Sequence, residues 1–393
     1  MVTFIPMQPQ VSLIIIGYNS KKFLKTCFDA IFAQTYGGPL EVIFIDNNST
    51  DDSVEWVKDT YKKYLDDADN TSRKLIVIKN TDNVGYTGAA NQGIKMSKGD
   101  YVVITNPDII YTPEYFEKAI ARMQQDAKIA ALTGKVVKYD FDAPNPGPTN
   151  LIDTVGLAIY RSRRVIDDGQ GLVDDGRFET EEDKVNGGHQ VFGVSGACPL
   201  YRRTALDDAK LTLETTKVGP DGTNVVETEV EFLDGNFFMY KEDVDLSWRL
   251  TLLGWKCWYT PEAIAYHGRG TGVAQRFTAE QMLNERTKLT PFQKGYSYTN
   301  QRLMQVKNEL WGNFWRDFLW IAARELGSLA YMTIREPYLW KSVVNFFKLL
   351  DVTLAKRRQI MARVEERWRE RGGLSAAARS MQQWFASQSR YVD

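Results

Sequence analysis

Short apolar runs recur along the first 108 residues and constrain the fold more than any other feature of the sequence. Each run lacks polar alternation, which is typical of a strand buried on both faces of a parallel sheet. Segments with helical spacing lie between the runs. This alternation of strand, loop and helix predicts a doubly wound parallel sheet. The runs are Val11–Ile16, Leu40–Ile45, Leu75–Ile78 and Tyr101–Thr105.

Polar residues follow three of these predicted strands at the point where each strand ends. Tyr18 follows the first, Asp46 the second and Asp108 the fourth. Open α/β sheets bind ligands at the carboxyl ends of their strands, so these side chains are candidates for a nucleotide site. Two plainer interpretations stay open. Asp46 fits a helix cap, and Asn106-Pro107-Asp108 fits an ordinary turn.

The stretch Asn83–Asn91 contains Gly85 and Gly88, which allow a backbone to approach a ligand closely. It matches neither the GxxxxGK[ST] pattern of a P-loop nor the GxGxxG pattern of a dinucleotide-binding fold. A strand-end carboxylate can hold a ribose or base, and a second can hold a divalent cation against a diphosphate. The sequence therefore predicts a nucleotide-diphosphate site without a Walker lysine.

Composition excludes several other classes of protein. The formal net charge of the 393 residues is -1, so no basic field for nucleic acid is present. Three well-separated cysteines form no metal-ligand pattern, and the N-terminus lacks the features of a signal peptide. No apolar run approaches the length of a membrane span. A cytoplasmic setting is expected.

Six stretches in a consistent order resemble family 2 glycosyltransferases with the GT-A fold. The resemblance implies an α/β fold, a Rossmann-like mixed sheet flanked by helices. We expect a catalytic domain at 1–298, with a nucleotide-sugar half at about 1–110 and an acceptor half at about 111–298. The stretches are Val11–Ser20, Ile45–Ser53, Asn83–Gly93, Asn106–Ile109, Phe238–Arg249 and the spaced residues Gly254 to His267.

The resemblance assigns roles to particular residues. It places the catalytic base at Asp243, with Glu242 as a neighbouring or acceptor contact. An acidic first helical turn is the plainer explanation for this pair. Asp108 and His267 would hold Mg²⁺ or Mn²⁺, although a lone histidine is often structural and Asn106 stands where an acid is common. The expected donor-binding residues are Tyr18, Asp46, Gly85, Asn91, Asn106 and Arg269.

Within the family, the likeness is to rhamnosyltransferases of cell-surface polysaccharide assembly. It rests on Asn106–Asp108, Ile152–Gly156 and Ser195–Arg203. It implies inverting transfer of L-rhamnose from dTDP-rhamnose to a saccharide or polyprenyl-linked saccharide. Alternatives are UDP-galactofuranose or UDP-N-acetylhexosamine as donor, or a non-catalytic carbohydrate-binding scaffold.

Three further segments have less certain roles. Residues 140–190 fit either a solvated excursion or an acceptor-binding lid, and 207–230 look like a polar insertion. Residues 299–393 show helical spacing, with tryptophans such as Trp311 and Trp315 among basic residues. They predict an α-helical appendage. It would be a layer packed on the catalytic domain, a homodimer contact or a peripheral contact with the inner face of the cell membrane.

Overall fold

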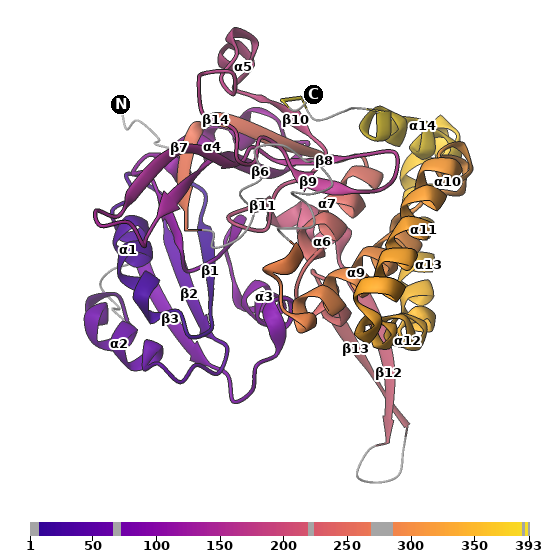
Figure 1. The fold of residues 1–393 in the computed structure, drawn as a ribbon. Coiled ribbons are helices and arrows are strands. Elements are labelled where there is room, and N and C mark those ends of the chain that lie inside the picture. The colour runs from indigo at the N-terminus through magenta and orange to yellow at the C-terminus, as the bar shows by residue number, and fades with distance from the viewer. Residues whose placement is uncertain (1–7, 66–71, 219–223, 269–285, 387–389, 392–393) are drawn as a thin grey trace.

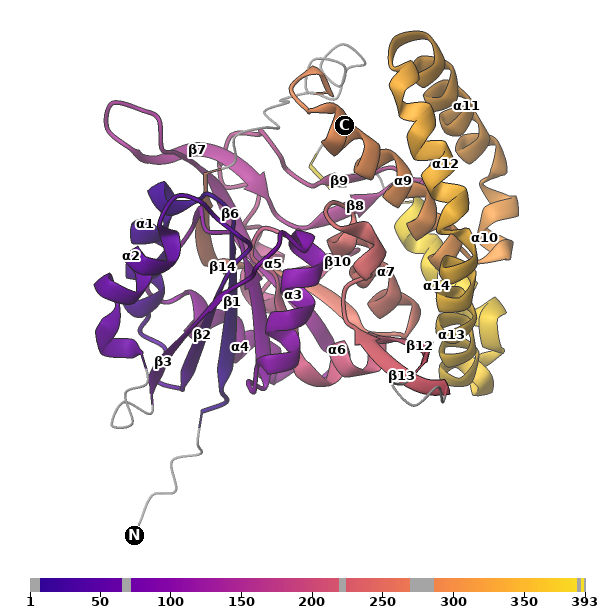
Figure 2. The ribbon, with the colours of Figure 1, turned by 90° about the horizontal axis from the view of Figure 1, so that it is seen from below.

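The structure is a computed structural model that describes residues 8–65, 72–218, 224–268, 286–386 and 390–391. A large sheet lies at its centre, with helices on both faces and a layer of C-terminal helices along one side (Figures 1 and 2). This arrangement confirms the predicted α/β fold with a helical C-terminal region.

The first four strands pair in parallel, as the apolar runs predicted. They are β1 (Val11–Gly17), β2 (Leu40–Asp46), β3 (Arg73–Lys79) and β4 (Tyr101–Thr105). β1 lies between β2 and β4, and β3 forms the edge. The carboxyl ends of β1 and β2 therefore lie side by side, with Gly17 opposite Asp46.

Beyond β4 the sheet becomes mixed. The short strand β11 (Leu200–Arg202) runs antiparallel between β4 and β6, and β14 pairs with β6 in parallel. The full order is β10-β14-β6-β11-β4-β1-β2-β3, with β5 paired to β14 and β7 to β6. The other strands of this sheet are β5 (Ile109–Tyr111), β6 (Ile129–Asp140), β7 (Gly147–Thr154), β10 (His189–Val191) and β14 (Lys256–His267).

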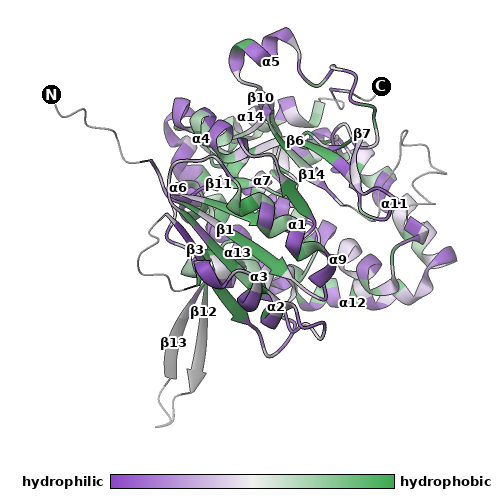
Figure 3. Cartoon of the chain, turned by 90° about the vertical axis from the view of Figure 1, so that its left-hand side faces the viewer, coloured by the Kyte–Doolittle hydropathy of each residue, from purple (hydrophilic) through white to green (hydrophobic). Residues whose placement is uncertain are grey.

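Alternate residues of the strands enter two separate hydrophobic cores. In β1, Ile14 and Ile16 belong to one core, whereas Leu13 and Ile15 belong to the other. Because both of its faces are buried, β1 is one of the strongly apolar segments of Figure 3. The flanking helices are α1 (Lys21–Phe32), α2 (Ser53–Thr60), α3 (Gly85–Met96), α4 (Tyr115–Gln125), α5 (Glu181–Asn186), α6 (Arg203–Ala209) and α7 (Glu242–Leu252).

Residues 140–190 are largely built into the body of the protein. They contribute β7 and a small antiparallel pair, β8 (Leu157–Ile159) with β9 (Val165–Asp167). Arg163, between β8 and β9, is fully buried and pairs with Glu309 and Asp317 of the C-terminal region. The segment at 207–230 forms much of the hairpin β12 (Leu211–Val218) and β13 (Asn224–Glu231).

The C-terminal region is helical, and its first helix spans the domain boundary expected at 298/299. Its long helices pack beside α7 and the β12–β13 hairpin (Figure 2). Among the residues that the structure describes, no helix is long and apolar enough to cross a membrane. The helices are α9 (Pro291–Asn308), α10 (Trp311–Arg316), α11 (Phe318–Arg335), α12 (Trp340–Lys348), α13 (Leu350–Trp368) and α14 (Gly373–Ala386).

Candidate active site

A polar cavity of about 450 Å³ lies where the ends of several strands meet the start of α7. Its lining comes from segments that are far apart in the sequence. Five of the residues predicted for the site lie in this lining, namely Asn106, Asp108, Glu242, Asp243 and His267. The charged and polar lining residues include Tyr86, Asn106, Asp108, Asp167, Ser195, Lys241, Glu242, Asp243 and His267.

Asp108 and His267 lie next to each other because β5, which follows Asp108, pairs with the end of β14. Ile109 is the partner of His267 in this antiparallel register. The Oδ1 atom of Asp108 lies 3.4 Å from Nε2 of His267. On the other side of the ring, Nδ1 of His267 lies 2.8 Å from Oδ2 of the buried Asp153 at the end of β7. The imidazole is thus held between two carboxylates.

The two carboxylates also determine how the imidazole ionises. Burial lowers the pKa of His267, but the carboxylates of Asp153 and Asp108 outweigh this effect and raise the pKa to about 9, so a cation that binds the ring must displace a proton. A histidine that ligates a metal commonly gives its second ring nitrogen to a carboxylate, as His267 does to Asp153. The described residues contain no group of three or more ligating side chains that could hold an ion alone. A cation here would need further oxygen ligands from a substrate, as Mg²⁺ often does.

Asp243 lies in the first turn of α7, where two backbone amides hold its carboxylate. The N–H of Gly196 donates to Oδ2 at 2.9 Å, and the N–H of Val244 donates to Oδ1 at 2.7 Å. Tyr86 of α3 in turn donates its hydroxyl to the carbonyl of Gly196 at 3.1 Å. Burial raises the pKa of Asp243, Lys241 opposes this and Asp167 adds to it. A fixed carboxylate with a raised pKa is suited to accept a proton.

Glu242 is the more deeply buried member of the pair. Burial and the neighbouring Asp243 raise its pKa to about 8. One of its carboxylate oxygens, Oε2, is buried and has no hydrogen-bond partner among the described residues. Two adjacent acids in one low-dielectric pocket cannot both ionise easily. Burial and this repulsion therefore both favour the protonated form of Glu242.

The turn before α7 has an unusual backbone. Phe238, Tyr240 and Lys241 all have positive φ angles, of 57°, 70° and 73°. Residues other than glycine rarely adopt this conformation, so the surrounding structure must hold it. Asn300 of α9 does so, because its side-chain amide donates to the carbonyls of Phe237, Met239 and Tyr240 at 2.8–2.9 Å. The C-terminal region thus holds the turn before α7 in its conformation.

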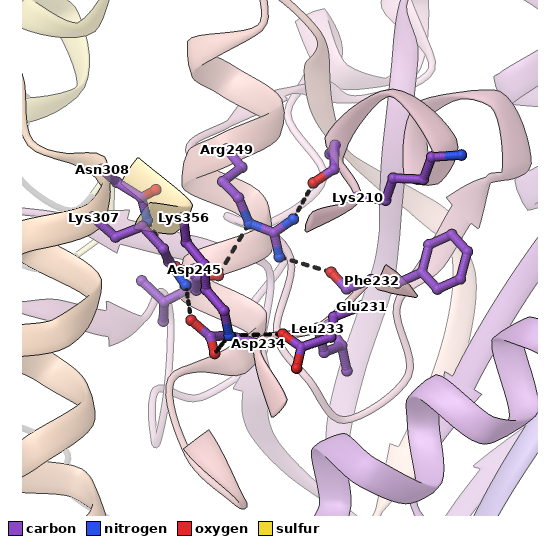
Figure 4. Close-up of polar contacts among 12 residues, drawn as sticks. Lys210, Glu231, Phe232, Leu233, Asp234, Asp245, Arg249, Lys307, Asn308 and Lys356 are labelled. Carbon is purple, nitrogen blue, oxygen red and sulfur yellow. Dashed lines mark hydrogen bonds and ion pairs between the residues drawn. The ribbon is translucent and has the colours of Figure 1, made fainter. Parts of the chain in front are cut away.

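A buried cluster of six charged side chains anchors α7 to the helical layer (Figure 4). Asp245 of α7 pairs with Lys307 at 2.9 Å and with Arg249 at 3.1 Å. Asp234 pairs with Lys307 and, at 2.5 Å, with Lys356. Lys356 also contacts Glu231 at 2.7 Å, so three acids face three bases. Burial would raise the pKa of Asp234, but the two lysines lower it well below its usual value.

Tyr18 and Asp46 lie at the adjacent ends of β1 and β2. Tyr18 is exposed, as expected for a side chain that stacks on a base. Asp46 is buried. Its Oδ2 accepts from the N–H of Ser49 at 2.9 Å, a bond within the loop before α2 and not a helix cap, because α2 begins at Ser53 with Asp52 as its N-cap residue. Its Oδ1 is also buried and has no hydrogen-bond partner among the described residues.

Two of the predicted donor-binding residues make contacts within the fold and lie outside the cavity lining. Gly85 begins α3 with a φ of 76°, and a side chain there would meet the ring and carbonyl of Phe238 at 2.5–2.7 Å. Asn91 is buried, and its side chain hydrogen-bonds the backbone of Phe232 and Leu233 at 2.8–3.0 Å. Neither lines the cavity. Arg269 lies outside the described residues.

Several residues of the site were not predicted from the sequence. Tyr86 and Asp167 line the cavity, Asp153 orients His267, and Asn300 holds the turn before α7. Asp153 lies within Ile152–Gly156 and Tyr86 within Asn83–Gly93, two stretches that carried the family resemblance, and this was the available signal. Nothing local marks Asp167 or Asn300, because their roles depend on contacts across the fold.

A comparison with protein-family models gives one match, to the model described as "Glycosyl transferase family 2". It covers residues 12–209, about half of the chain. The matched region includes β1 to β4 and ends just before the β12–β13 hairpin. It therefore contains Asp46, Asp108 and Asp153, but not Asp243 or His267.

Individual relatives match about a third of the chain. An uncharacterised glycosyltransferase of Haemophilus influenzae is 27% identical over 124 residues, covering 32% of this chain and 36% of the relative. The UDP-Glc:alpha-D-GlcNAc-diphosphoundecaprenol beta-1,3-glucosyltransferase WfaP of Escherichia coli is 29% identical over 131 residues, covering 33% and 48%. Each of these alignments spans less than half of the relative's own length.

The crystal structure of GalNAc-T7 with UDP, GalNAc and Mn²⁺ has a similar fold. It superimposes with a TM-score of 0.54 at 14% sequence identity, covering 87% of this chain and 56% of that one. At this level of identity the likeness concerns the fold alone. It extends well beyond the matched family region, into the C-terminal half of the chain.

Proposed function

Because this chain belongs to glycosyl transferase family 2, we propose that it is an inverting, divalent-cation-dependent glycosyltransferase. Its favoured donor is dTDP-L-rhamnose, and its acceptor is a saccharide or a polyprenyl-linked saccharide of a surface polysaccharide. Asp243 is the catalytic base. Glu242 contacts the acceptor, and Asp108 with His267 forms the protein's part of the cation site.

The observation that carries this proposal is the position of Asp243 relative to Asp108 and His267. All three line one cavity, and they reach it from α7, from the loop after β4 and from the end of β14. An inverting transfer needs a carboxylate that takes the proton of the acceptor hydroxyl as this attacks the anomeric carbon. Backbone amides fix the Asp243 carboxylate, and Lys241 lies beside it to stabilise the ionised form.

We place the donor's diphosphate in the same cavity, beside Asp108 and His267. Asp108 and His267 would hold a Mg²⁺ or Mn²⁺ ion there, which would neutralise the charge of the departing nucleoside diphosphate. Asp153 keeps the imidazole of His267 turned towards Asp108. Asn106 lines the cavity beside them and can donate a hydrogen bond to a phosphate oxygen. Arg269, which follows His267 closely in the chain, remains our candidate for a second diphosphate contact.

The nucleoside would lie across the ends of β1 and β2. The exposed ring of Tyr18 offers a stacking surface, and the unpartnered Oδ1 of Asp46 offers an acceptor for a base or ribose donor group. Because Asp46 is buried, the loop between Asp46 and Asp51 would have to shift as the nucleoside binds. L-rhamnose is favoured by the sequence resemblance, and UDP-galactofuranose and UDP-N-acetylhexosamines are the alternatives.

We place the reaction in the cytoplasm, at the inner face of the cell membrane. The name of the Escherichia coli relative describes an acceptor linked to diphosphoundecaprenol, and an acceptor of this chemical class would bring the chain to a membrane surface. A homodimer formed through the C-terminal helices is the other arrangement that the sequence favours.

The test is a transfer assay with a panel of nucleotide sugars, read as released nucleoside diphosphate and as glycosylated acceptor. One donor should give cation-dependent turnover, and Asp243→Asn should lower it by about 10²- to 10⁴-fold while calorimetry shows unchanged donor binding. Asp142→Asn, at an exposed position, is the matched control. Wild-type turnover by Asp243→Asn would exclude the base assignment. Full activity in excess chelator would exclude the cation. Donor binding without any transfer would favour the carbohydrate-binding scaffold.

A further inference from the structure

Helices α10, α11 and α12 expose an unusually apolar face. In the eighteen residues of α11, only Ile321 and Met332 are buried, and no residue of α12 is buried. Exposed apolar residues that gather in large patches mark protein or membrane interaction sites. We call the exposed residues of these three helices the α10–α12 face. Its exposed apolar residues are Trp311, Trp315, Phe318, Leu319, Trp320, Leu326, Leu329, Ile334, Trp340, Val344 and Phe347.

In α12 the exposed residues follow a regular pattern. Trp340, Val344 and Phe347 lie at i, i+4 and i+7, so they form one apolar stripe along the helix. Lys341 and Lys348 are exposed next to the two aromatic ends of the stripe. An apolar stripe bordered by lysines is the pattern of a helix that lies in the interface of a bilayer. Tryptophan is also a preferred residue at that depth.

The charge that this face presents to solvent is positive. Its acidic residues are Asp317, Glu325 and Glu336, and each is held in ion pairs within the protein. Asp317 pairs with Arg163 at 2.9 Å, Glu325 with Arg302 at 2.6 Å and Glu336 with Lys294 at 2.9 Å. The charged residues between 311 and 348 that are exposed are all basic, namely Arg335, Lys341 and Lys348.

We propose that the α10–α12 face docks on the surface of an anionic lipid bilayer. The exposed basic residues would contact anionic headgroups, and the apolar, tryptophan-rich surface would enter the acyl layer below them. A second copy of the chain matches less well. In a two-fold contact the same basic residues would face each other across the interface, which is unfavourable.

A groove connects this face with the neighbourhood of the cavity. It holds about 630 Å³ between the first half of α9 and the segment that leads into α12, and Phe292, Tyr338, Val344 and Lys348 are part of its lining. Tyr296, also in the lining, stacks on Phe238 with ring centroids 5.1 Å apart. Phe238 precedes Met239 and Tyr240, which line the cavity. The groove therefore suits the apolar chain of a lipid-linked acceptor, a role that rests on the proposed function.

The test measures vesicle binding by the full chain without donor or acceptor. Co-sedimentation is compared for vesicles of phosphatidylglycerol with phosphatidylcholine and for phosphatidylcholine alone. The wild-type chain should bind the anionic vesicles, and added salt should weaken the binding. Lys341→Glu/Lys348→Glu should lower the partition coefficient by at least about thirty-fold, and Trp340→Ala/Phe347→Ala should also lower it. Lys58→Glu/Lys62→Glu, on exposed lysines at the α2 end of the molecule, is the matched control and should bind as wild type does.

The proposal is overturned if the wild-type chain stays in the supernatant with both kinds of vesicle, or if the α12 variants bind as well as wild type. It is also overturned if light scattering shows a dimer that the same α12 substitutions dissociate, because the face would then be a contact between copies. Vesicle binding and sugar transfer are measured separately. A chain that binds vesicles but transfers no sugar contradicts the proposed function alone.

Discussion

Lys307 of α9 and Asp245 of α7 form an ion pair of 2.9 Å in a part of the protein from which solvent is excluded. Asp245 lies two residues after Asp243, so this pair ties the helical layer to the helix that carries the proposed base. Asn308 reinforces it by donating its side-chain amide to the same oxygen of Asp245 at 2.8 Å. The position of α7 therefore depends on residues of the C-terminal region.

Lys307→Met should destabilise the protein strongly. It removes a cation from between Asp234 and Asp245 and leaves excess negative charge buried, which costs about 3 kcal/mol of unfolding free energy. Urea unfolding followed by circular dichroism measures the change. Lys341→Met, the same substitution at an exposed lysine, should stay within about 0.5 kcal/mol of wild type. Equal stability of the two variants would show that the buried cluster does not hold the helical layer in place.

Asn300→Ala should slow catalysis more than it weakens donor binding. The substitution removes the amide that fixes three carbonyls of the positive-φ turn, so Asp243 is held less well in its working position. We expect kcat to fall by about ten-fold or more, with the donor Kd within about two-fold of wild type. Steady-state kinetics and calorimetry measure the two quantities.

The exposed Asn145→Ala is the control for this comparison and should leave kcat unchanged. Asn300 would have a general structural role if Asn300→Ala lowered donor affinity and kcat in equal proportion. The same would follow if the substitution lowered only the stability of the protein. A positioning role requires the effect to fall mainly on kcat.

Asp153→Asn should weaken the apparent affinity for the activating cation by about 10- to 100-fold. The amide no longer supplies the negative charge that orients the imidazole of His267 and increases its basicity. Activity as a function of Mn²⁺ concentration measures this, and saturating Mn²⁺ should restore most of the turnover. Asp59→Asn, at an exposed position on α2, should leave the titration unchanged. A loss of activity that no concentration of Mn²⁺ restores would contradict this role of Asp153.

Glu242→Gln should stabilise the protein at alkaline pH. The pKa of Glu242 is raised to about 8 in the folded protein, from an ordinary value of 4.5. The folded state then binds more protons than the unfolded state between these two values, so wild-type stability falls as pH rises through that window. Glutamine does not ionise, so the variant does not lose this stability. Between pH 4.5 and pH 9, the difference in unfolding free energy between the two proteins should therefore shift in favour of the variant by on the order of 3 kcal/mol.

Urea unfolding at both pH values provides the measurement, with the exposed Glu114→Gln as the control. Parallel pH profiles for Glu242→Gln and wild type would mean that Glu242 ionises normally in the folded protein.

The parts of the fold that the sequence predicted well depend on local pattern. The apolar runs became β1 to β4 because β1, β2 and β4 are buried on both faces and are therefore apolar at most positions, whereas the edge strand β3 is only partly buried. The antiparallel insertion of β11 between β4 and β6 could not be predicted in the same way, because three residues carry no periodicity of their own. Its place is decided by pairing with strands about 70 and 100 positions earlier.

In the candidate site, too, local sequence predicted some features and contacts between distant segments decided others. Asp108, Asp243 and His267 belong to stretches that can be compared with a family, and the structure brings them to one cavity. Gly85 and Asn91 also belong to such a stretch, but they pack against Phe238 and the 232–233 backbone. The sequence around a residue therefore indicates that it matters, whereas its partners across the fold decide whether it meets a ligand or supports the structure.

The charge cluster has a consequence for the order in which the chain becomes active. Glu231, Asp234 and Asp245 are synthesised before Lys307 and Lys356, so a ribosome-bound chain that ends before α9 has only Arg249 of the three bases in this cluster. The charge of the cluster is balanced only after α13 has been made and has packed against α9. The α7 side of the proposed active site is thus completed late in translation, after the helices of the α10–α12 face have been made.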